Sequence, residues 1–183
     1  YGNVTSTAVD TYTGETTLTG TVLTANTYAA DDAARWRLGR LTASTVTHRR
    51  PGLADVVKTA SFAYAMSGAA TGLLTQETTQ PGGGVEQELR KVHALDAWGN
   101  RTRSSTCSTD IASCGSTAVT FQPTSATSIN RYAKVTYDSL GRYPVSTSEP
   151  FWSGSGTVER IVQTVVSRNV FGDVTQAYDV NGV

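Results

Sequence analysis

Apolar and polar residues alternate along several short runs of the chain, which is the pattern of strands with two unlike faces. The clearest runs are Val56 to Tyr64, Val85 to Leu95, Arg131 to Tyr137 and Thr157 to Val166. The last run carries adjacent branched residues, which would suit a strand buried on both faces. The pattern predicts an all-β chain built from antiparallel hairpins.

Signals for helix are scarce. Asp31 to Gly39 could form two helical turns, with an Asp N-cap and glycine as the stop. Glu86 to Ala94 has helical propensity as well, but it runs into a turn at Asp96, so we expect a strand there. We therefore predict little or no helix.

A short turn recurs along the chain. An aromatic or apolar residue (Arg168 in one looser copy) precedes Asp or Asn, two variable residues follow, and then come Gly and, except in the last copy, a polar residue. The clear copies, which we call the repeat turns, contain Asp96 and Gly99; Tyr137, Asp138 and Gly141; Asn169 and Gly172; and Tyr178, Asp179 and Gly182. Degenerate copies occur at 1–5 and 36–42. Asp or Asn accepts backbone hydrogen bonds as the chain reverses, and Gly takes the positive φ that closes the turn.

Composition agrees with many strands and turns. The chain holds 30 Thr, 17 Ser and 17 Gly, and Thr suits a pleated surface better than a helix. Charged residues are 16% of the chain and the formal net charge is zero, so we expect no nucleic-acid partner. No apolar run approaches the roughly 18 residues that span a bilayer, so we expect no membrane span.

The two cysteines, Cys107 and Cys114, lie close together in a turn-rich segment. A disulfide between them would close a short loop and add about 2–3 kcal/mol in the chain-entropy view. Two reduced thiols are the alternative. A zinc site would need two more ligands, and the histidines are His48 and His93 alone, so we expect no metal or cofactor.

The repeat turns carry a family resemblance. Tyr137-Asp138-x-x-Gly141-Arg142 and Tyr178-Asp179-x-x-Gly182 resemble the tyrosine–aspartate (YD) repeat of RHS proteins, of the large secreted toxin-complex type. The resemblance implies a curved, spiralling sheet of hairpins that forms part of a hollow β-shell. It also implies a secreted or cell-surface bacterial protein whose shell encloses a toxin or effector.

The chain also departs from the family. The family's core ending, Asp-Pro-x-Gly followed by a Gly-rich stretch, is absent, so the aspartates credited with self-cleavage cannot be placed here. Both ends fall inside repeats, and we expect residues 1–183 to be a single shell segment truncated at both ends. A sub-boundary is expected near residues 79–85.

The histidines and paired acidic residues fit structural roles better than catalytic ones. His48, His93 beside Asp96, and the acid pair Glu86 and Glu88 could serve acid–base chemistry. Residues three apart on a strand point to opposite faces, which argues against His93 with Asp96. We therefore expect no enzyme.

The sequence predicts a non-catalytic segment of an RHS-type shell. Its partners would be the rest of its parent polypeptide and an enclosed toxin or effector, and exposed strand edges could also associate with each other. The alternative is an extracellular β-sandwich adhesin or carbohydrate-binding module. In that case Trp36, Trp98 and Trp152 could form a sugar platform, although aromatic residues on hairpins more often pack across strands.

Overall fold

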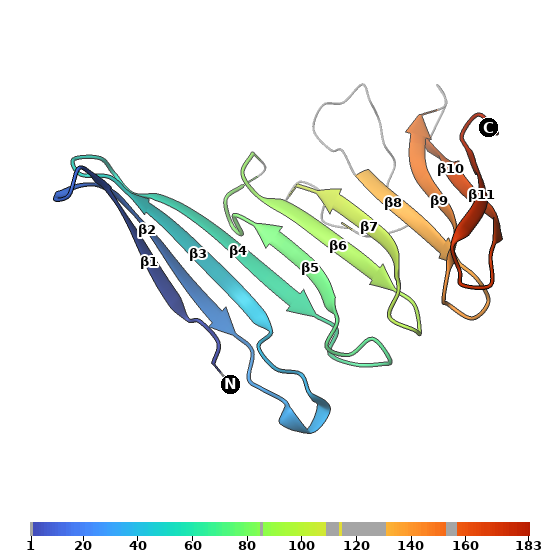
Figure 1. Ribbon diagram of the computed structural model, residues 1–183, viewed down its shortest axis with the longest axis horizontal. Coiled ribbons are helices and arrows are strands. Elements are labelled where there is room, and N and C mark those ends of the chain that lie inside the picture. The colour runs from blue at the N-terminus through green and yellow to red at the C-terminus, as the bar shows by residue number, and fades with distance from the viewer. Residues whose placement is uncertain (1, 85, 109–113, 115–130, 153–156) are drawn as a thin grey trace. The chain divides into compact units, whose positions relative to one another are not determined.

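The computed structural model describes residues 2–84, 86–108, 114, 131–152 and 157–183. Its eleven strands form one antiparallel sheet in which the order of the strands is their order in the chain (Figure 1). The strands are β1 (Ser6–Thr13), β2 (Thr17–Tyr28), β3 (Leu41–Arg49), β4 (Val56–Tyr64), β5 (Leu74–Thr79), β6 (Leu89–Leu95), β7 (Arg101–Cys107), β8 (Arg131–Tyr137), β9 (Pro144–Trp152), β10 (Thr157–Arg168) and β11 (Val174–Asp179). The all-β, antiparallel fold predicted from the sequence is confirmed.

The chain divides into two compact units. The first holds residues 1–63 and 77–88, and the second holds residues 64–76 and 89–183. The boundary predicted near residues 79–85 stays a prediction, as does the single-segment organisation.

In the first unit, β1 to β4 pair antiparallel, with Val9 opposite Val22, Val22 opposite His48, and His48 opposite Val56, and the register shifts once in the β1–β2 pair and once in the β2–β3 pair. Val56 and Val57 are neighbours on β4 and point to opposite faces. These residues are 57% and 46% exposed, so both faces are open at this end of β4, whereas Thr59 to Phe62 farther along are half-buried.

In the second unit, burial concentrates on β7, where every second residue from Arg103 to Cys107 is buried. Cys107 is the one buried apolar side chain among the described residues; the other buried side chains are polar: Thr78, His93, Arg103, Ser105 and Ser148. The sheet therefore has no packed apolar core in the described part of the chain.

Three local features differ from what the sequence suggested. The strand from Thr157 is not buried on both faces, because Ile161 and Val166 are 56% and 49% exposed. Asp31 to Gly39 forms no α-helix: a single 3₁₀ turn at Ala33–Arg35 is enclosed by two hydrogen bonds between the backbones of Asp32 and Arg37. Trp36 then takes a left-handed conformation, with φ of 54°, which ends the turn.

The strand predicted from Val85 begins later, at Leu89. The backbone N–H groups of Gln87 and Glu88 both donate to the carbonyl of Gly84 and close a turn there. Glu86 and Glu88 therefore do not share a strand face, and the glycosidase-like pairing has no basis in the fold.

Candidate functional site: the repeat turns

In each of the four repeat turns the Asp or Asn side chain accepts hydrogen bonds from two backbone N–H groups of its own turn. In the turn between β6 and β7, the side chain of Asp96 accepts from the backbone N–H groups of Trp98 and Asn100, both at 2.9 Å. The backbone of Asp96 donates to the carbonyl of Asn100 and accepts from Gly99. The chain is thus reversed by one acidic side chain and one glycine, as the motif predicts.

The other three copies repeat this arrangement. Asn169 accepts from Phe171 and Asp173, and Asp179 accepts from Asn181 and Val183. In the turn between β8 and β9, which is one residue longer, Asp138 accepts from Arg142 and Tyr143. The four glycines have positive φ, at 87° for Gly99, 65° for Gly141, 92° for Gly172 and 77° for Gly182.

These hydrogen bonds favour the ionised form of the aspartates. Donation from Arg142, opposed by desolvation and aided by Tyr143, lowers the pKa of Asp138 below its ordinary value. Donation from Val183 and Asn181 lowers the pKa of Asp179. At Asp96 desolvation raises the pKa, but hydrogen bonds from Asn100, Trp98 and Gly99 together outweigh it and the pKa is lowered. Asn169 performs the same structural task without a charge.

Successive turns at one end of the hairpins also touch each other. A β-carbon added to Gly141 would lie 2.7 Å from Cδ2 of Trp98, which belongs to the preceding repeat turn. A β-carbon on Gly172 would lie 2.5 Å from Cε1 of Tyr143, again from the preceding turn. We call each such pairing, a side chain covering the glycine of the next turn, a turn-to-turn contact.

The series extends back to the loop between β4 and β5, where Cδ1 of Leu73 lies 2.6 Å from the position of a β-carbon on Gly99. Since real β-carbons essentially never lie within 3.0 Å of another heavy atom, alanine at any of the three positions would force the covering side chain to shift, in addition to the strain of positive φ. The turn glycine therefore has two tasks, and only the first can be read from the motif.

Polar side chains reinforce these contacts. Nδ2 of Asn100 donates to the carbonyl of Gly141 at 2.6 Å and also to its own turn aspartate at 3.0 Å. Arg168 donates to the carbonyls of Gly172 and Pro144, and its guanidinium lies 5.0 Å from the ring of Tyr143. The turns at Asp96 and Asp138, and those at Asp138 and Asn169, are thereby joined by both a ring contact and a hydrogen bond.

The degenerate copies differ. Gly39 donates its N–H to the side chain of Asp31, so the stretch at 36–42 does not form the repeat-turn pattern. Even so, Oδ1 of Asn3 lies 2.8 Å from the position of a β-carbon on Gly39. A close contact onto a positive-φ glycine thus occurs in the first unit too. Tyr1 lies outside the described residues.

The motif tyrosines lie on the strands that flank the turns. Tyr137 ends β8 opposite Pro144, and Tyr178 lies on β11 opposite Thr164. The hydroxyl of Tyr178 accepts a hydrogen bond from Gln176. The tyrosines take no part in the turn hydrogen bonds, which are made by the Asp or Asn.

Cys107 and Cys114 form a disulfide, with 6.0 Å between their Cα atoms, which is the pairing that the sequence favours. It starts in β7, next to the most buried part of the second unit. The bond therefore anchors the chain where it leaves the sheet.

A second polar cluster joins strands on one face of the second unit. The guanidinium of Arg103 lies 3.9 Å from the ring of Tyr132, whose hydroxyl donates to Glu159 at 3.2 Å, and Lys134 pairs with the same carboxylate at 2.9 Å. Desolvation and the nearby carboxylate raise the pKa of Tyr132, and Lys134 lowers the pKa of Glu159. These contacts link β7 to β8 and, across β9, β8 to β10, and sequence reasoning did not find them.

The candidate catalytic residues do not come together. His93 is buried, and its Nδ1 lies 2.9 Å from Oγ of Ser104, its cross-strand partner. The carboxylate of Asp96 is engaged by its own turn, and His48 lies in the first unit. Among the described residues, no three His, Cys, Asp or Glu side chains gather as metal ligands.

The tryptophan platform of the alternative reading stays a prediction. Trp36 and Trp98 are 82% and 65% exposed and belong to different units. Nothing is described of the side chain of Trp152. Trp98 is instead occupied by its contact with Gly141.

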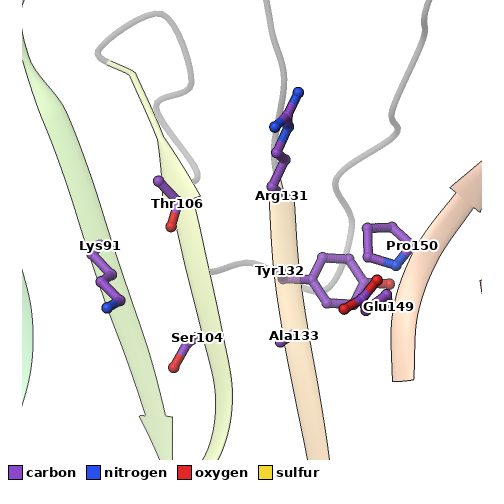
Figure 2. Close-up of a pocket in the computed structure, with 8 residues that line it drawn as sticks. All are labelled: Lys91, Ser104, Thr106, Arg131, Tyr132, Ala133, Glu149 and Pro150. Carbon is purple, nitrogen blue, oxygen red and sulfur yellow. The ribbon is translucent and has the colours of Figure 1, made fainter. Parts of the chain in front are cut away.

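A hollow with a volume of about 460 Å³ lies in the second unit (Figure 2). Figure 2 shows the ring of Tyr132 directed from β8 toward Glu149 and Pro150 of β9. The pairing between these strands begins at Lys134 and Ser148, so the hollow lies where the two strands are unpaired. Its lining mixes Lys91, Arg131 and Glu149 with small side chains and presents no base–nucleophile pair with an orienting acid.

In the described residues, no helix has the length and apolar character to cross a membrane. Comparison with protein-family models finds no match, and comparison with curated proteins finds none either. The arrangement of the repeat turns is therefore the strongest indication of function in this chain.

Proposed function

We propose that the chain is a structural, non-catalytic segment of an RHS-type wall, which encloses or carries a toxin or effector as part of a longer secreted polypeptide. The observation that supports this most is the combination of one open sheet in strict chain order with turn-to-turn contacts between its hairpins. Such a sheet can be lengthened by further hairpins that keep the same strand order and the same contacts between turns.

The near absence of buried apolar side chains also favours a wall. A sandwich adhesin would bury two apolar faces against each other, about 10 Å apart. In the described part of the chain the strands belong to one sheet, and both faces are exposed at the start of β4, at Val56 and Val57. A single layer is suited to separating two compartments.

Limited proteolysis of the natural parent polypeptide tests this proposal. The wall predicts a parent much longer than 19.4 kDa, in which a non-repeat segment resists protease until the sheet is unfolded. The adhesin alternative predicts a protein without a protected segment that binds immobilised glycans, and that result would contradict the proposal.

A further inference from the structure

The turn between β10 and β11 has a side chain in the covering position, Phe171, but the described part of the chain has no following turn for it to cover. Trp98 lies two residues after Asp96 and covers the glycine of the next turn. Phe171 lies two residues after Asn169, in the equivalent position of the turn between β10 and β11. Its side chain is 84% exposed, and the neighbouring Val170 is 93% exposed.

The contacts have one direction along the chain. Leu73 covers Gly99, Trp98 covers Gly141, and Tyr143 covers Gly172, so the covering side chain always belongs to the earlier turn. Beyond the turn at Asn169, the next turn in this direction would lie past β11. The edge of β11 is the last in the sheet order, with five of its six residues exposed.

The turn at Asp179 is closed in the same way as the turns that precede β7 and β11. The backbone of Asp179 donates to the carbonyl of Val183, and Val183 donates back to the side chain of Asp179. At Asp96 and Asn169, the residue after the corresponding position begins the returning strand. A strand joined to Val183 would therefore run antiparallel beside β11.

We propose that Val170 and Phe171 form a binding surface for the glycine of a further Asp/Asn-x-x-Gly turn, carried by a hairpin that is joined to Val183 and pairs with β11. This inference rests on the proposed wall and names the contact by which the wall grows. Val170 and Phe171 would recognise the further turn by apolar contact with the backbone of its glycine, and a β-carbon on that glycine would block the contact.

A covalent extension tests the proposal. A second copy of Arg131–Trp152, which contains β8, its turn and β9, is added after Val183. The backbone amides of β11 should then exchange about tenfold more slowly or better, because their free edge becomes paired. The same extension with Gly141→Ala in the added copy should keep strand pairing but lose the contact with Phe171.

Phe171→Ala supplies the sharper comparison. In the original chain this exposed side chain should be replaceable with no measurable change in Tm, whereas in the extended chain the substitution should lower Tm. Equal effects in both chains would overturn the proposal, as would an added hairpin that stays unprotected while β1 to β11 remain intact. Self-association of the original chain with Phe171 protected would assign the surface to a second copy instead and would also overturn it.

The two proposals fail separately. A hairpin that docks on Phe171 in a parent without a protected effector would leave the contact standing and remove the wall. Conversely, a parent with a protected effector, together with a Phe171→Ala effect that is the same with and without the extension, would leave the wall standing and remove the contact.

Discussion

The turn at Asp138 and the turn between β1 and β2 have almost the same glycine conformation but different surroundings. Gly141 has φ of 65° and Gly14 has φ of 66°. Gly141 is covered by Trp98, whereas a β-carbon on Gly14 would meet nothing within 4 Å. The comparison shows that positive φ is a local property of a turn, and that contact with the next hairpin is a separate property which a motif does not reveal.

The largest expected effect is the difference in stability between the Gly141→Ala and Gly14→Ala variants. Alanine at either position must adopt a left-handed backbone, which costs about 1–2 kcal/mol. Gly141→Ala must also displace Trp98, which should cost about 1–3 kcal/mol more as overpacking. Chemical denaturation of the two variants measures the difference in unfolding free energy. Equal losses would mean that the contact contributes nothing.

Removal of the covering side chain should have a smaller effect. Trp98→Ala loses the apolar area that rests on Gly141, worth about 1–2 kcal/mol. Trp36→Ala is the matched control, because Trp36 is 82% exposed, and should change stability by less than about 0.5 kcal/mol. In the Trp98→Ala background, Gly141→Ala should cost no more than Gly14→Ala does. A full additional cost there would contradict a direct contact.

The side chain of Asp138 should stabilise its turn through the hydrogen bonds that its oxygen accepts and not through its negative charge. Asn169, like Asp138, accepts from two backbone N–H groups of its own turn, although from different positions in it. Asp138→Asn should therefore keep Tm close to that of the original chain near neutral pH, and Asp138→Ala should lower it by less than Gly141→Ala does. Thermal unfolding followed by circular dichroism measures all three. An asparagine variant as unstable as the alanine variant would show that charge is essential.

The smallest expected effect is a difference between the Asp138 turn and the Asn169 turn when the pH is lowered. Because hydrogen bonding lowers the pKa of Asp138 in the fold, its contribution to stability is complete above the unfolded value of about 3.9 and is lost as pH falls through the lower folded value. The amide of Arg142 should shift with a midpoint below about pH 3.9, and the amide of Phe171, held by Asn169, should not follow it. NMR shifts between pH 6 and 2 report both. A midpoint for Arg142 at or above the ordinary value would contradict the assigned hydrogen bonds.

Much of the local structure can be predicted from the sequence. The strands Val56–Tyr64 and Arg131–Tyr137 have the predicted bounds, and the repeat turns reverse the chain where Asp or Asn precedes Gly. Each of these features depends on alternation or on a few adjacent residues. The errors at residues 31–39 and 85–88 are local as well, since backbone turns closed by Asp32 and Gly84 compete there with helix and strand.

The contacts between hairpins could not be predicted. Trp98 is 43 residues from Gly141 in the numbering, and their meeting depends on the pairing of β7, β8 and β9. The pairing of Arg103 with Tyr132 and Glu159 depends on the same registers. A single sequence specifies which residues begin a turn, but the side chain that covers the turn follows only from the sheet.

The most direct test of the account is the chemical shift of the Gly141 α-protons, compared with those of Gly14. The account predicts that the Trp98 ring shifts the Gly141 protons upfield, that Trp98→Ala abolishes the shift, and that Gly14 is unchanged throughout. Gly141 protons that resemble those of Gly14, or that do not respond to Trp98→Ala, would contradict the turn-to-turn contact on which the proposed wall depends.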